Sequence, residues 1–421
     1  MTLRALLSLG LLCCFSLSTV ALRAADKWEL QYEHLDKEYD LRLLDIAFVD
    51  ATHGVASGFI DSRERERQRP VNLVTTDGKT WTLVETKKLC QDLHALKSGV
   101  IFAACEDGIY RSVELGRDWN RVARLKDIES IWFLNERVGF AVGTSRGFYS
   151  TQDGGQRWAP VTPTPELTTT KDYTVLRHIH FVNDKVGFIA GWSRPPKGRE
   201  ELPDWMTPDR AMRQRDTPHV NVFLDTSDGG LTWKSQEVSM FGEIVSAMLG
   251  PDHTGLTLLN FSNAFEFPAE VFYFNWPKGM MKRTFRETNR AVTDIALPAE
   301  GPAYLAAVEP MGQLFWSPIP GKLRILRSVD FMKWEEMDVD YRASARRARL
   351  QALDAANVWA ITDTGMILKL RQDGPVLTRK PLPPDVDPPA HIAKPESKPN
   401  APTAKPSPAK PDSAKPWAPK Q

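Results

Sequence analysis

Hydrophobic and polar residues alternate with a period of two in many short stretches of the chain. In residues 138–143, the bulky Val138, Phe140 and Val142 alternate with small residues. Successive side chains of a strand point to opposite faces, so this pattern predicts a strand with one bulky face and one nearly bare face. Such strands suit sheets that stack closely face to face.

The segment after this strand, residues 151–158, matches the Asp-box (BNR repeat) pattern Ser/Thr-x-Asp-x-Gly-x-x-Trp. The Thr151 hydroxyl and the Asp153 carboxylate can accept hydrogen bonds from backbone N–H groups of a tight turn, whose glycines can adopt positive φ. Trp158 can fill the junction beneath. The motif therefore predicts a turn between two strands and not a catalytic site.

The box occurs five times, which indicates a repeat architecture. One further copy is complete, two are shortened by one residue, and one has Glu in place of Asp. The acidic residue and the tryptophan of the boxes are Asp77 and Trp81, Glu114 and Trp119, Asp153 and Trp158, Asp228 and Trp233, and Asp330 and Trp334.

The spacing of the boxes predicts the number of repeats. The box tryptophans are separated by 38, 39, 75 and 101 residues, and a four-stranded propeller blade takes about 40 to 50 residues. The third interval therefore indicates a blade with a long insertion, and the fourth holds two blades. The first of these has no box, and its strands are expected near residues 244–248, 256–261, 271–275 and 283–287.

Both ends of the repeat region are incomplete. Residues 350–353, 358–362 and 366–370 form three expected strands that lack a fourth, and residues 28–33 form an expected strand without a blade. Joining them closes a ring and protects the sheet edges. We therefore predict an all-β, seven-bladed β-propeller of four-stranded antiparallel blades at residues 26–375. Six or eight blades are the alternatives if the blade without a box is misread.

The first 25 residues have the features of a cleaved secretory signal peptide. Arg4 precedes an apolar run, and small residues lie near position 25. A retained anchor helix is an alternative that the short, serine-interrupted run disfavours, and a lipoprotein is a minor one. We expect a periplasmic or secreted protein.

Cleavage removes Arg4 and Arg23, which changes the formal charge from +1 to −1, and no charge signal for nucleic-acid binding remains.

The exported chain would keep two cysteines, Cys90 and Cys105. If Lys97 and Ser98 form the tip of a hairpin, Leu96 pairs with Gly99 and the same register places the cysteines opposite each other. Export makes a disulfide between them chemically reasonable. Free buried cysteines are the alternative, because directly opposed pairs strain the bridge.

Two arginine-rich segments, residues 61–70 and 192–219, interrupt the first and fourth predicted blades, and a third, residues 342–349, joins the sixth blade to the seventh. In an up-and-down sheet, loops between second and third strands share a face with loops between blades, and the Asp boxes occupy the other face. All three segments are therefore expected on one face, where loops on a rigid scaffold commonly meet partners. The predicted partner-binding residues are Arg63, Arg65, Arg67, Arg69, Arg194, Lys197, Arg199, Trp205, Arg210, Arg213, Arg215, Arg342, Arg346, Arg347 and Arg349. Each segment alone also fits a solvated loop, since acidic residues are interleaved with the basic ones.

Residues 376–421 are rich in proline, lysine and alanine and are expected to form an extended, disordered tail. Residues 380–421 contain seven lysines and four acidic residues, so this span could contact cell wall or an anionic membrane surface. A plain spacer fits equally well.

The pattern Phe-x-Asn/Asp-x-x-x-Gly-Phe-x-x-Gly, followed by an Asp box, resembles the propeller family of photosystem II assembly and stability factors. It occurs at residues 133–158 and 181–233. The resemblance implies a seven-bladed, exported, non-enzymatic protein without cofactors. It also implies binding of a protein partner, which could be a subunit of a membrane complex. We expect a monomer.

A sialidase-like glycoside hydrolase is the alternative, because it shares the Asp boxes. That chemistry needs three arginines, a Tyr–Glu pair and an acidic proton donor around the pore. Arg69 and Pro70 match one sialidase motif only in part, because the Ile or Val expected between them is missing, and no Tyr–Glu pair can be assigned. His178 and His180 share a strand face, yet no third ligand at a recognisable spacing supports a metal site.

Overall fold

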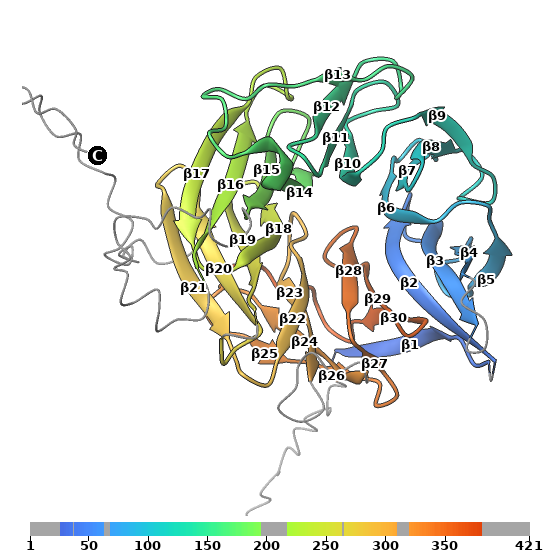
Figure 1. Cartoon of the computed structure of the whole chain (residues 1–421). Coiled ribbons are helices and arrows are strands. Elements are labelled where there is room, and N and C mark those ends of the chain that lie inside the picture. Colours follow the sequence, from blue (N-terminus) through green and yellow to red (C-terminus); the bar gives the residue numbers. More distant parts are fainter. Residues whose placement is uncertain are drawn as a thin grey trace, which may run out of the picture. The chain divides into compact units, whose positions relative to one another are not determined.

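The computed structural model describes residues 26–36, 38–62, 68–194, 217–262, 265–309 and 320–380, and these residues form seven β-sheets arranged around a central axis (Figure 1). The first sheet consists of β2 (Tyr39–Phe48), β3 (Gly54–Ser62), β4 (Gln68–Thr75) and β5 (Thr82–Glu85). The second consists of β6 (Cys90–Ala95), β7 (Ile101–Cys105), β8 (Gly108–Ser112) and β9 (Asn120–Ala123). The third consists of β10 (Ile128–Phe133), β11 (Gly139–Gly143), β12 (Phe148–Thr151) and β13 (Ala159–Pro160).

The fourth sheet consists of β14 (Thr174–Phe181), β15 (Gly187–Ser193), β16 (His219–Thr226) and β17 (Lys234–Met240), and the 3-10 helix η1 (Lys171–Tyr173) precedes it. The fifth consists of β18 (Glu243–Leu249), β19 (Thr254–Asn260), β20 (Ala269–Asn275) and β21 (Met280–Arg286). The sixth consists of β22 (Ala291–Ala296), β23 (Ala303–Glu309), β24 (Gly321–Ser328) and β25 (Glu335–Glu336), and β27 (Ser344–Ala345) also pairs with β24. The predicted blade without an Asp box is therefore present as the fifth.

The seventh sheet joins the two ends of the repeat region. β28 (Ala348–Ala352), β29 (Val358–Thr362) and β30 (Met366–Arg371) come from the C-terminal side, and β1 (Lys27–Glu33) supplies the fourth strand. β1 runs antiparallel to β30, and β26 (Asp338–Val339) pairs with the outer edge of β1 in parallel. The predicted seven-bladed propeller, closed by its N-terminal strand, is confirmed.

The box tryptophans pack in the junctions between blades. Trp233 of the fourth blade contacts Phe140 and Phe148 of the third blade, with ring centroids 5.8 and 5.2 Å apart. Aromatic side chains of this size bury a large apolar surface between neighbouring sheets. The wheel is therefore held together by large apolar residues on the faces of its blades.

The loops divide between two faces as predicted. In the box turns, Gly154 N–H donates to the Arg137 carbonyl (2.9 Å) and Gly229 N–H to the Lys185 carbonyl (2.9 Å), so the boxes lie beside the turns between first and second strands. We call this side the Asp-box face. On the other side, Arg347 N–H donates to the Asp363 carboxylate in the β29–β30 turn (3.1 Å). We call that side the arginine face, because the described ends of the three arginine-rich segments lie there.

The innermost strands of the first six blades share a β-bulge near their starts, at Leu44, Gln91, Glu129, Arg177, Val245 and Thr293. The hairpin register near the tip of the second blade differs from the predicted one. Leu96 N–H donates to the Val100 carbonyl (2.8 Å), one residue beyond the expected pairing with Gly99. Because Gln91 bulges, the register shifts back by one residue and Cys90 still lies opposite Cys105.

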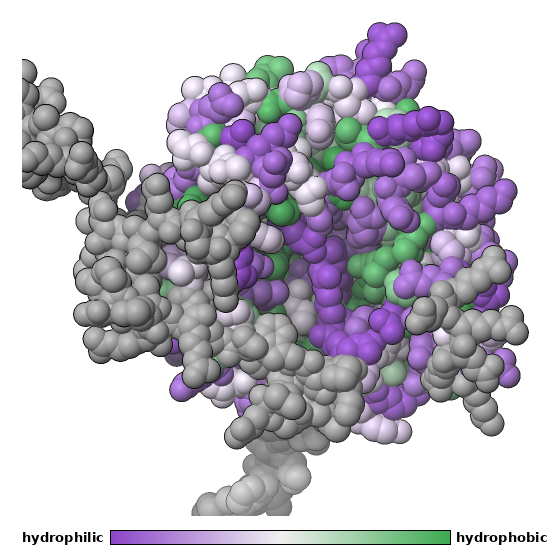
Figure 2. Space-filling model, in the orientation of Figure 1, coloured by the Kyte–Doolittle hydropathy of each residue, from purple (hydrophilic) through white to green (hydrophobic). Residues whose placement is uncertain are grey.

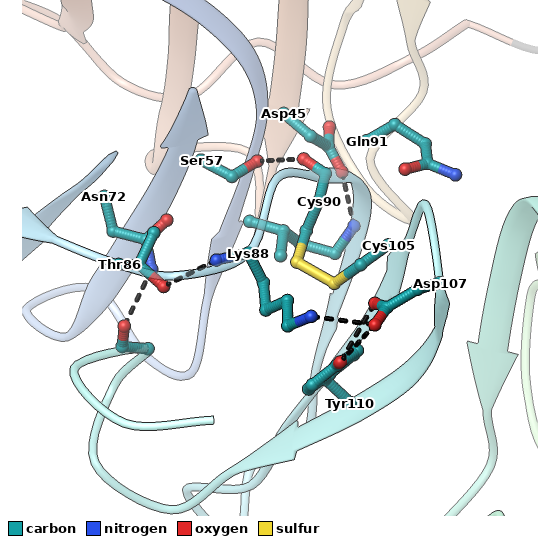
Figure 3. Close-up of a disulfide and its surroundings, with 12 residues drawn as sticks. Asp45, Ser57, Asn72, Thr86, Lys88, Cys90, Gln91, Cys105, Asp107 and Tyr110 are labelled. Carbon is teal, nitrogen blue, oxygen red and sulfur yellow. Dashed lines mark hydrogen bonds and ion pairs between the residues drawn. A yellow bond between two sulfur atoms is a disulfide. The ribbon is translucent and has the colours of Figure 1, made fainter. Parts of the chain in front are cut away.

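Cys90 and Cys105 are joined by a disulfide in the second blade (Figure 3). Lys88 Nζ lies 2.7 Å from Asp107 Oδ2, and Tyr110 Oη donates to the same carboxylate at 2.9 Å. Both cysteines are almost fully buried. The bridge therefore links two inner strands beneath a polar cluster at the edge of the blade.

Residues 376–380, which the composition assigned to the tail, lie against the sixth blade. Arg379 Nη2 donates to the Pro298 carbonyl (2.6 Å), and Lys380 N–H donates to the Val329 carbonyl (2.7 Å). The ordered chain thus continues past the predicted boundary at residue 375. The predicted signal peptide (1–25) and the part of the tail at 381–421 lie outside the described residues. No helix among the residues described has the length and hydropathy needed to span a bilayer.

Candidate functional site: the central pore and its arginine-bearing end

Nine of the fifteen predicted partner-binding residues lie outside the described residues. They are Arg63, Arg65, Arg67, Lys197, Arg199, Trp205, Arg210, Arg213 and Arg215. The other six, Arg69, Arg194, Arg342, Arg346, Arg347 and Arg349, are described, and their environments differ sharply.

Four of these six arginines are ion-paired on the arginine face. Arg69 lies 3.6 Å from Glu85, and Arg194 lies 3.1 Å from Glu243. Arg342 and Arg346 each lie 2.9 Å from an aspartate carboxylate, Asp340 and Asp363 respectively. The local contacts of these four arginines therefore agree with the alternative that the loop charges are neutralised by neighbouring acidic residues.

Arg349 departs from the expectation that residues 342–349 form a loop projecting from the propeller. It lies in β28, the innermost strand of the seventh blade, and its guanidinium points into the pore, where Nη1 lies 3.3 Å from Asp45 Oδ1. The strand begins at Ala348, because this backbone pairs with β29 from Ala348↔Thr362 onward. Arg349 is therefore a pore residue and not a surface residue.

Arg349 occupies one of seven equivalent positions that ring the pore. Each of the first six blades places a residue there directly after its bulge, and the ring consists of Asp45, Asp92, Ser130, His178, Ser246, Asp294 and Arg349. The backbone shows the equivalence, since the residue after the ring position donates its N–H to the preceding blade's aspartate. Leu93 donates to Asp45 (2.7 Å), Ile131 to Asp92 (2.8 Å) and Leu350 to Asp294 (2.9 Å).

The three ring aspartates are held in an environment that opposes their ionisation. Burial raises the pKa of Asp45 and of Asp294, while the Arg349 charge acts against the rise. Burial, together with the Asp45 charge, raises the pKa of Asp92 to about 7. The three carboxylates in turn raise the pKa of Arg349, against the opposing effect of burial. Arg349 is thus the cation that all three carboxylates share.

Two more arginines complete a positive cluster at the end of the pore that opens on the arginine face. Arg177, at the bulge of β14, is ion-paired with Glu129 of the third blade. Arg347 makes no side-chain hydrogen bond or ion pair with any residue that the structure describes. The Arg349 charge, with partial desolvation of the exposed guanidinium at the pore end and the Arg177 charge, lowers the pKa of Arg347 to about 10, although the Asp294 and Asp45 charges act against this shift. An anionic group would therefore be attracted to Arg347 and would reduce the repulsion between it and the neighbouring arginines.

The opposite end of the pore forms a cavity of about 900 Å³ on the Asp-box face. Trp132 lies between His94 and His180 on three consecutive inner strands, with ring centroids 4.4 and 5.0 Å away. Leu96 and Leu134 lie at the rim, toward the Asp boxes. Figure 2 shows hydrophilic side chains gathered around the hollow at the middle of the wheel.

The cavity histidines are held neutral. Burial lowers the pKa of His94 and of His180 to about 4, and burial together with the His180 charge lowers that of His178 to about 3. His94 Nε2 bonds the Phe133 carbonyl (2.9 Å), and His178 Nδ1 bonds the Ala247 carbonyl (3.0 Å). In the described part of the chain, no group of three or more His, Cys, Asp or Glu side chains is placed to hold a metal ion.

Reasoning from the sequence missed the ring aspartates, Arg177 and Trp132. Asp45, Asp92 and Asp294 lie in strands otherwise rich in apolar residues, at the same position in each repeat. A charged residue recurring at one position of an apolar strand is a signal that an alignment of the blades to each other can show. The convergence of these residues on one axis is visible only in three dimensions.

No family model and no curated protein matches the chain. Among solved structures, its fold is similar to that of YCF48 bound to D1 peptide, with a TM-score of 0.53 at 14% identity, covering 83% of this chain and 97% of that one. YCF48 from Cyanidioschyzon merolae gives 0.51 at 13% identity, covering 82% and 98%. The tricorn protease gives 0.50 at 9% identity, covering 83% of this chain but 36% of its own. At these identities, the likeness establishes the propeller fold.

Proposed function

We propose that this chain is an exported, non-enzymatic scaffold that binds another protein through its arginine face and supports the assembly or stability of a membrane or envelope complex. The sequence resemblance to photosystem II assembly and stability factors supports this role. The similarity in fold to YCF48 bound to D1 peptide supports the use of such a propeller to bind a peptide. The arginine face supplies the site.

The observation that carries the proposal is the state of Arg347. Its side chain is exposed at the end of the pore, has no charged partner among the described residues, and lies in the positive field of Arg349 and Arg177. A carboxylate from a partner would gain a charge-assisted, two-pronged contact with such a guanidinium. We therefore propose an acidic group, a side-chain or terminal carboxylate, as the part of the partner that enters here.

Apolar side chains on the same face extend the proposed surface. Leu35 and Tyr341 are each 83% exposed. Leu35 follows β1, and Tyr341 lies next to Arg342, which contacts Glu33 at the end of that strand (3.5 Å). Exposed aromatic residues beside arginines are typical of the residues that dominate binding energy in protein interfaces.

The proposal is tested by capture of partners from the envelope of the native organism with purified protein. The variant R347E should lower the yield of the captured partner roughly tenfold, because it replaces attraction by repulsion at one contact. The control R137E changes the net charge equally on the Asp-box face and should capture as well as wild type. Equal capture by R347E and wild type would contradict the proposal. Circular dichroism checks that both variants are folded.

One observation favours the sialidase-like alternative, namely that Arg177, Arg347 and Arg349 converge at one end of the pore. Three arginines are what such an enzyme uses to hold a carboxylate, although here Arg177 and Arg349 are ion-paired with Glu129 and Asp45. Assay of a fluorogenic sialoside separates the two functions. Turnover by wild type that R347E abolishes would replace the scaffold role by catalysis.

A further inference from the structure

The cavity on the Asp-box face is lined at its middle level by the residues that lie two positions after the ring. His94, Trp132 and His180 are three of them, on the second, third and fourth blades. Met248 of the fifth blade and Gln351 of the seventh lie at the same level. Aromatic, polar and apolar side chains therefore face one another across the cavity.

The cavity histidines present hydrogen-bond acceptors to this space. Burial lowers the pKa of His94 to about 4 and, together with the His180 charge, lowers that of His178 to about 3, so both are neutral at pH 7. A neutral imidazole has one N–H group and one lone pair. The N–H belongs to the nitrogen that contacts a carbonyl, which is Nε2 of His94 and Nδ1 of His178. Nδ1 of His94 and Nε2 of His178 are therefore acceptors, and neither bonds a residue that the structure describes.

Three further side chains add unpaired polar groups. The Trp132 indole N–H and the Gln351 amide make no hydrogen bond with any described residue. Asp92 Oδ2 accepts the Ile131 N–H (2.8 Å), and Asp92 Oδ1 has no hydrogen-bond partner in the described part of the chain. The described protein encloses none of these atoms completely, so each can be reached from the cavity. The cavity thus offers both donors and acceptors.

The charges at the bottom of the cavity favour a ligand without net charge. Asp45, Asp92 and Arg349 line this level, and Arg349 Nη1 lies 3.3 Å from Asp45 Oδ1. The carboxylates would repel an anion, and the guanidinium would repel a cation. A neutral molecule that carries several polar groups avoids both penalties.

We infer that the Asp-box-face cavity binds a neutral saccharide. Each sugar hydroxyl supplies one donor and two acceptor lone pairs, which suits a wall that mixes acceptors such as His94 Nδ1 with donors such as Trp132 Nε1. The C–H groups of a pyranose ring are apolar and can pack against the accessible part of Trp132 and against Leu96 and Leu134 at the mouth.

The size of the cavity agrees with such a ligand. A volume of about 900 Å³ lies within the range of small-molecule sites and accommodates roughly two or three hexose rings. The site is at the opposite end of the pore from Arg347. The inference therefore goes beyond the proposed function and does not depend on it.

The test follows the indole N–H resonance of Trp132 by NMR in the full chain with isotope-labelled tryptophan, and the variant Trp132→Phe assigns that resonance. Maltotriose, cellotriose and triacetylchitotriose are each titrated to roughly 20 mM, which covers dissociation constants into the millimolar range. We expect at least one of them to shift the Trp132 resonance saturably. The resonance of Trp233, a blade-junction residue that does not line the cavity, should stay unchanged.

Two cavity variants test the contacts at pH 8, where Asp92, with its pKa raised to about 7, is ionised. In Asp92→Asn the amide oxygen can keep the Ile131 N–H, so a donor replaces the acceptor that faces the cavity, and binding should weaken about tenfold. Gln351→Leu removes the amide and should weaken binding about fivefold. The control Asp252→Asn makes the same charge change at an exposed turn of the Asp-box face, outside the cavity, and should bind like wild type.

Circular dichroism confirms that each variant is folded. The inference is overturned if none of the three saccharides shifts the Trp132 resonance, or if both cavity variants bind as tightly as wild type. It is also overturned if the charged probes 2-phenylethylamine or 3-phenylpropionate shift this resonance and the saccharides do not. Each of these outcomes leaves partner capture by the arginine face unaffected, so the two proposals fail separately.

Discussion

The guanidinium of Arg349 lies 3.3 Å from the carboxylate of Asp45, and this contact joins the last blade to the first. Asp45 also accepts the Leu93 N–H from the second blade (2.7 Å). One buried carboxylate thus connects three consecutive blades around the closure of the wheel. The hydrogen bonds of β1 close the outer part of the ring, and this ion pair closes it at the axis.

Removing Arg349 should destabilise the fold strongly. In Arg349→Met, three buried aspartates lose the cation that they share, and an unpaired buried charge costs about 3–5 kcal/mol of unfolding free energy. Chemical denaturation at pH 8 measures the change. The control Arg371→Met breaks exposed pairs with Glu29 and Asp373 and should cost less than about 1 kcal/mol. Similar losses in the two variants would show that Arg349 is no more important than a surface arginine.

Asp92 should make stability depend on pH. Its pKa is raised from 3.8 to about 7, so the folded chain binds more protons than the unfolded chain between these values. The contribution of Asp92 is therefore most favourable below 3.8 and is lost as the pH rises to about 7. Asp92→Asn cannot ionise, and its amide oxygen can still accept the Ile131 N–H.

The difference in unfolding free energy between Asp92→Asn and wild type should therefore change in favour of Asp92→Asn as the pH rises from 3.8 to about 7. Above about pH 7 the difference should stay constant. Denaturation of both proteins at several pH values between 4.5 and 8 measures the difference. A difference that stays constant over this range would show that Asp92 titrates alike in the folded and unfolded chains.

The disulfide should stabilise the second blade against unfolding. Cys90 and Cys105 are separated by 15 positions, and closing a loop of that length is worth about 3 kcal/mol by its effect on the unfolded chain. Reduction should lower the melting temperature of wild type. The double variant with alanine at both positions should melt near the reduced protein and should not respond to reductant. A wild type insensitive to reductant under conditions that expose the bond would contradict the assignment.

Substitutions in the second Asp box should stabilise the protein, because its acidic residue, Glu114, is one methylene longer than the aspartate of the other boxes. In the third box, Asp153 Oδ1 accepts the Arg157 N–H (2.9 Å), whereas the Glu114 side chain makes no such contact in the described structure. Leu115 also has φ +53°, where Gly154 has φ +76°.

Glu114→Asp should restore the turn hydrogen bond and raise the unfolding free energy by about 0.5–1.5 kcal/mol. Leu115→Gly should relieve backbone strain of about 1 kcal/mol. Thermal denaturation of the two single variants and the double variant measures both gains. Glu136→Asp, in an exposed turn on the same face, is the control. A loss of stability in Glu114→Asp would mean that this turn does not use the Asp-box hydrogen bonds.

Much of the architecture could be predicted from local signals. Each box carries its own hydrogen-bonding aspartate and its own tryptophan, and the strands on either side alternate visibly. These features act within one blade, so the spacing from Trp81 to Trp334 predicted six blades and the division of loops between two faces. Joining the incomplete ends of the repeat region predicted the seventh blade. The pairing of Cys90 with Cys105 followed from the same kind of local register, after the bulge at Gln91 offset an error of one residue.

The pore was decided by the tertiary structure. Asp45, Asp92, Asp294 and Arg349 stand far apart in the sequence, and each alone looks like an ordinary charged residue in an apolar strand. Closing the ring brings one position of every inner strand onto a common axis, where burial and mutual charge change their ionisation. Local patterns therefore specified the blades, because strands and turns are made by neighbours in sequence. The charged ring, the contacts of Trp132 with His94 and His180, and the charge cluster around Arg347 depended on closure, because they join residues of different blades.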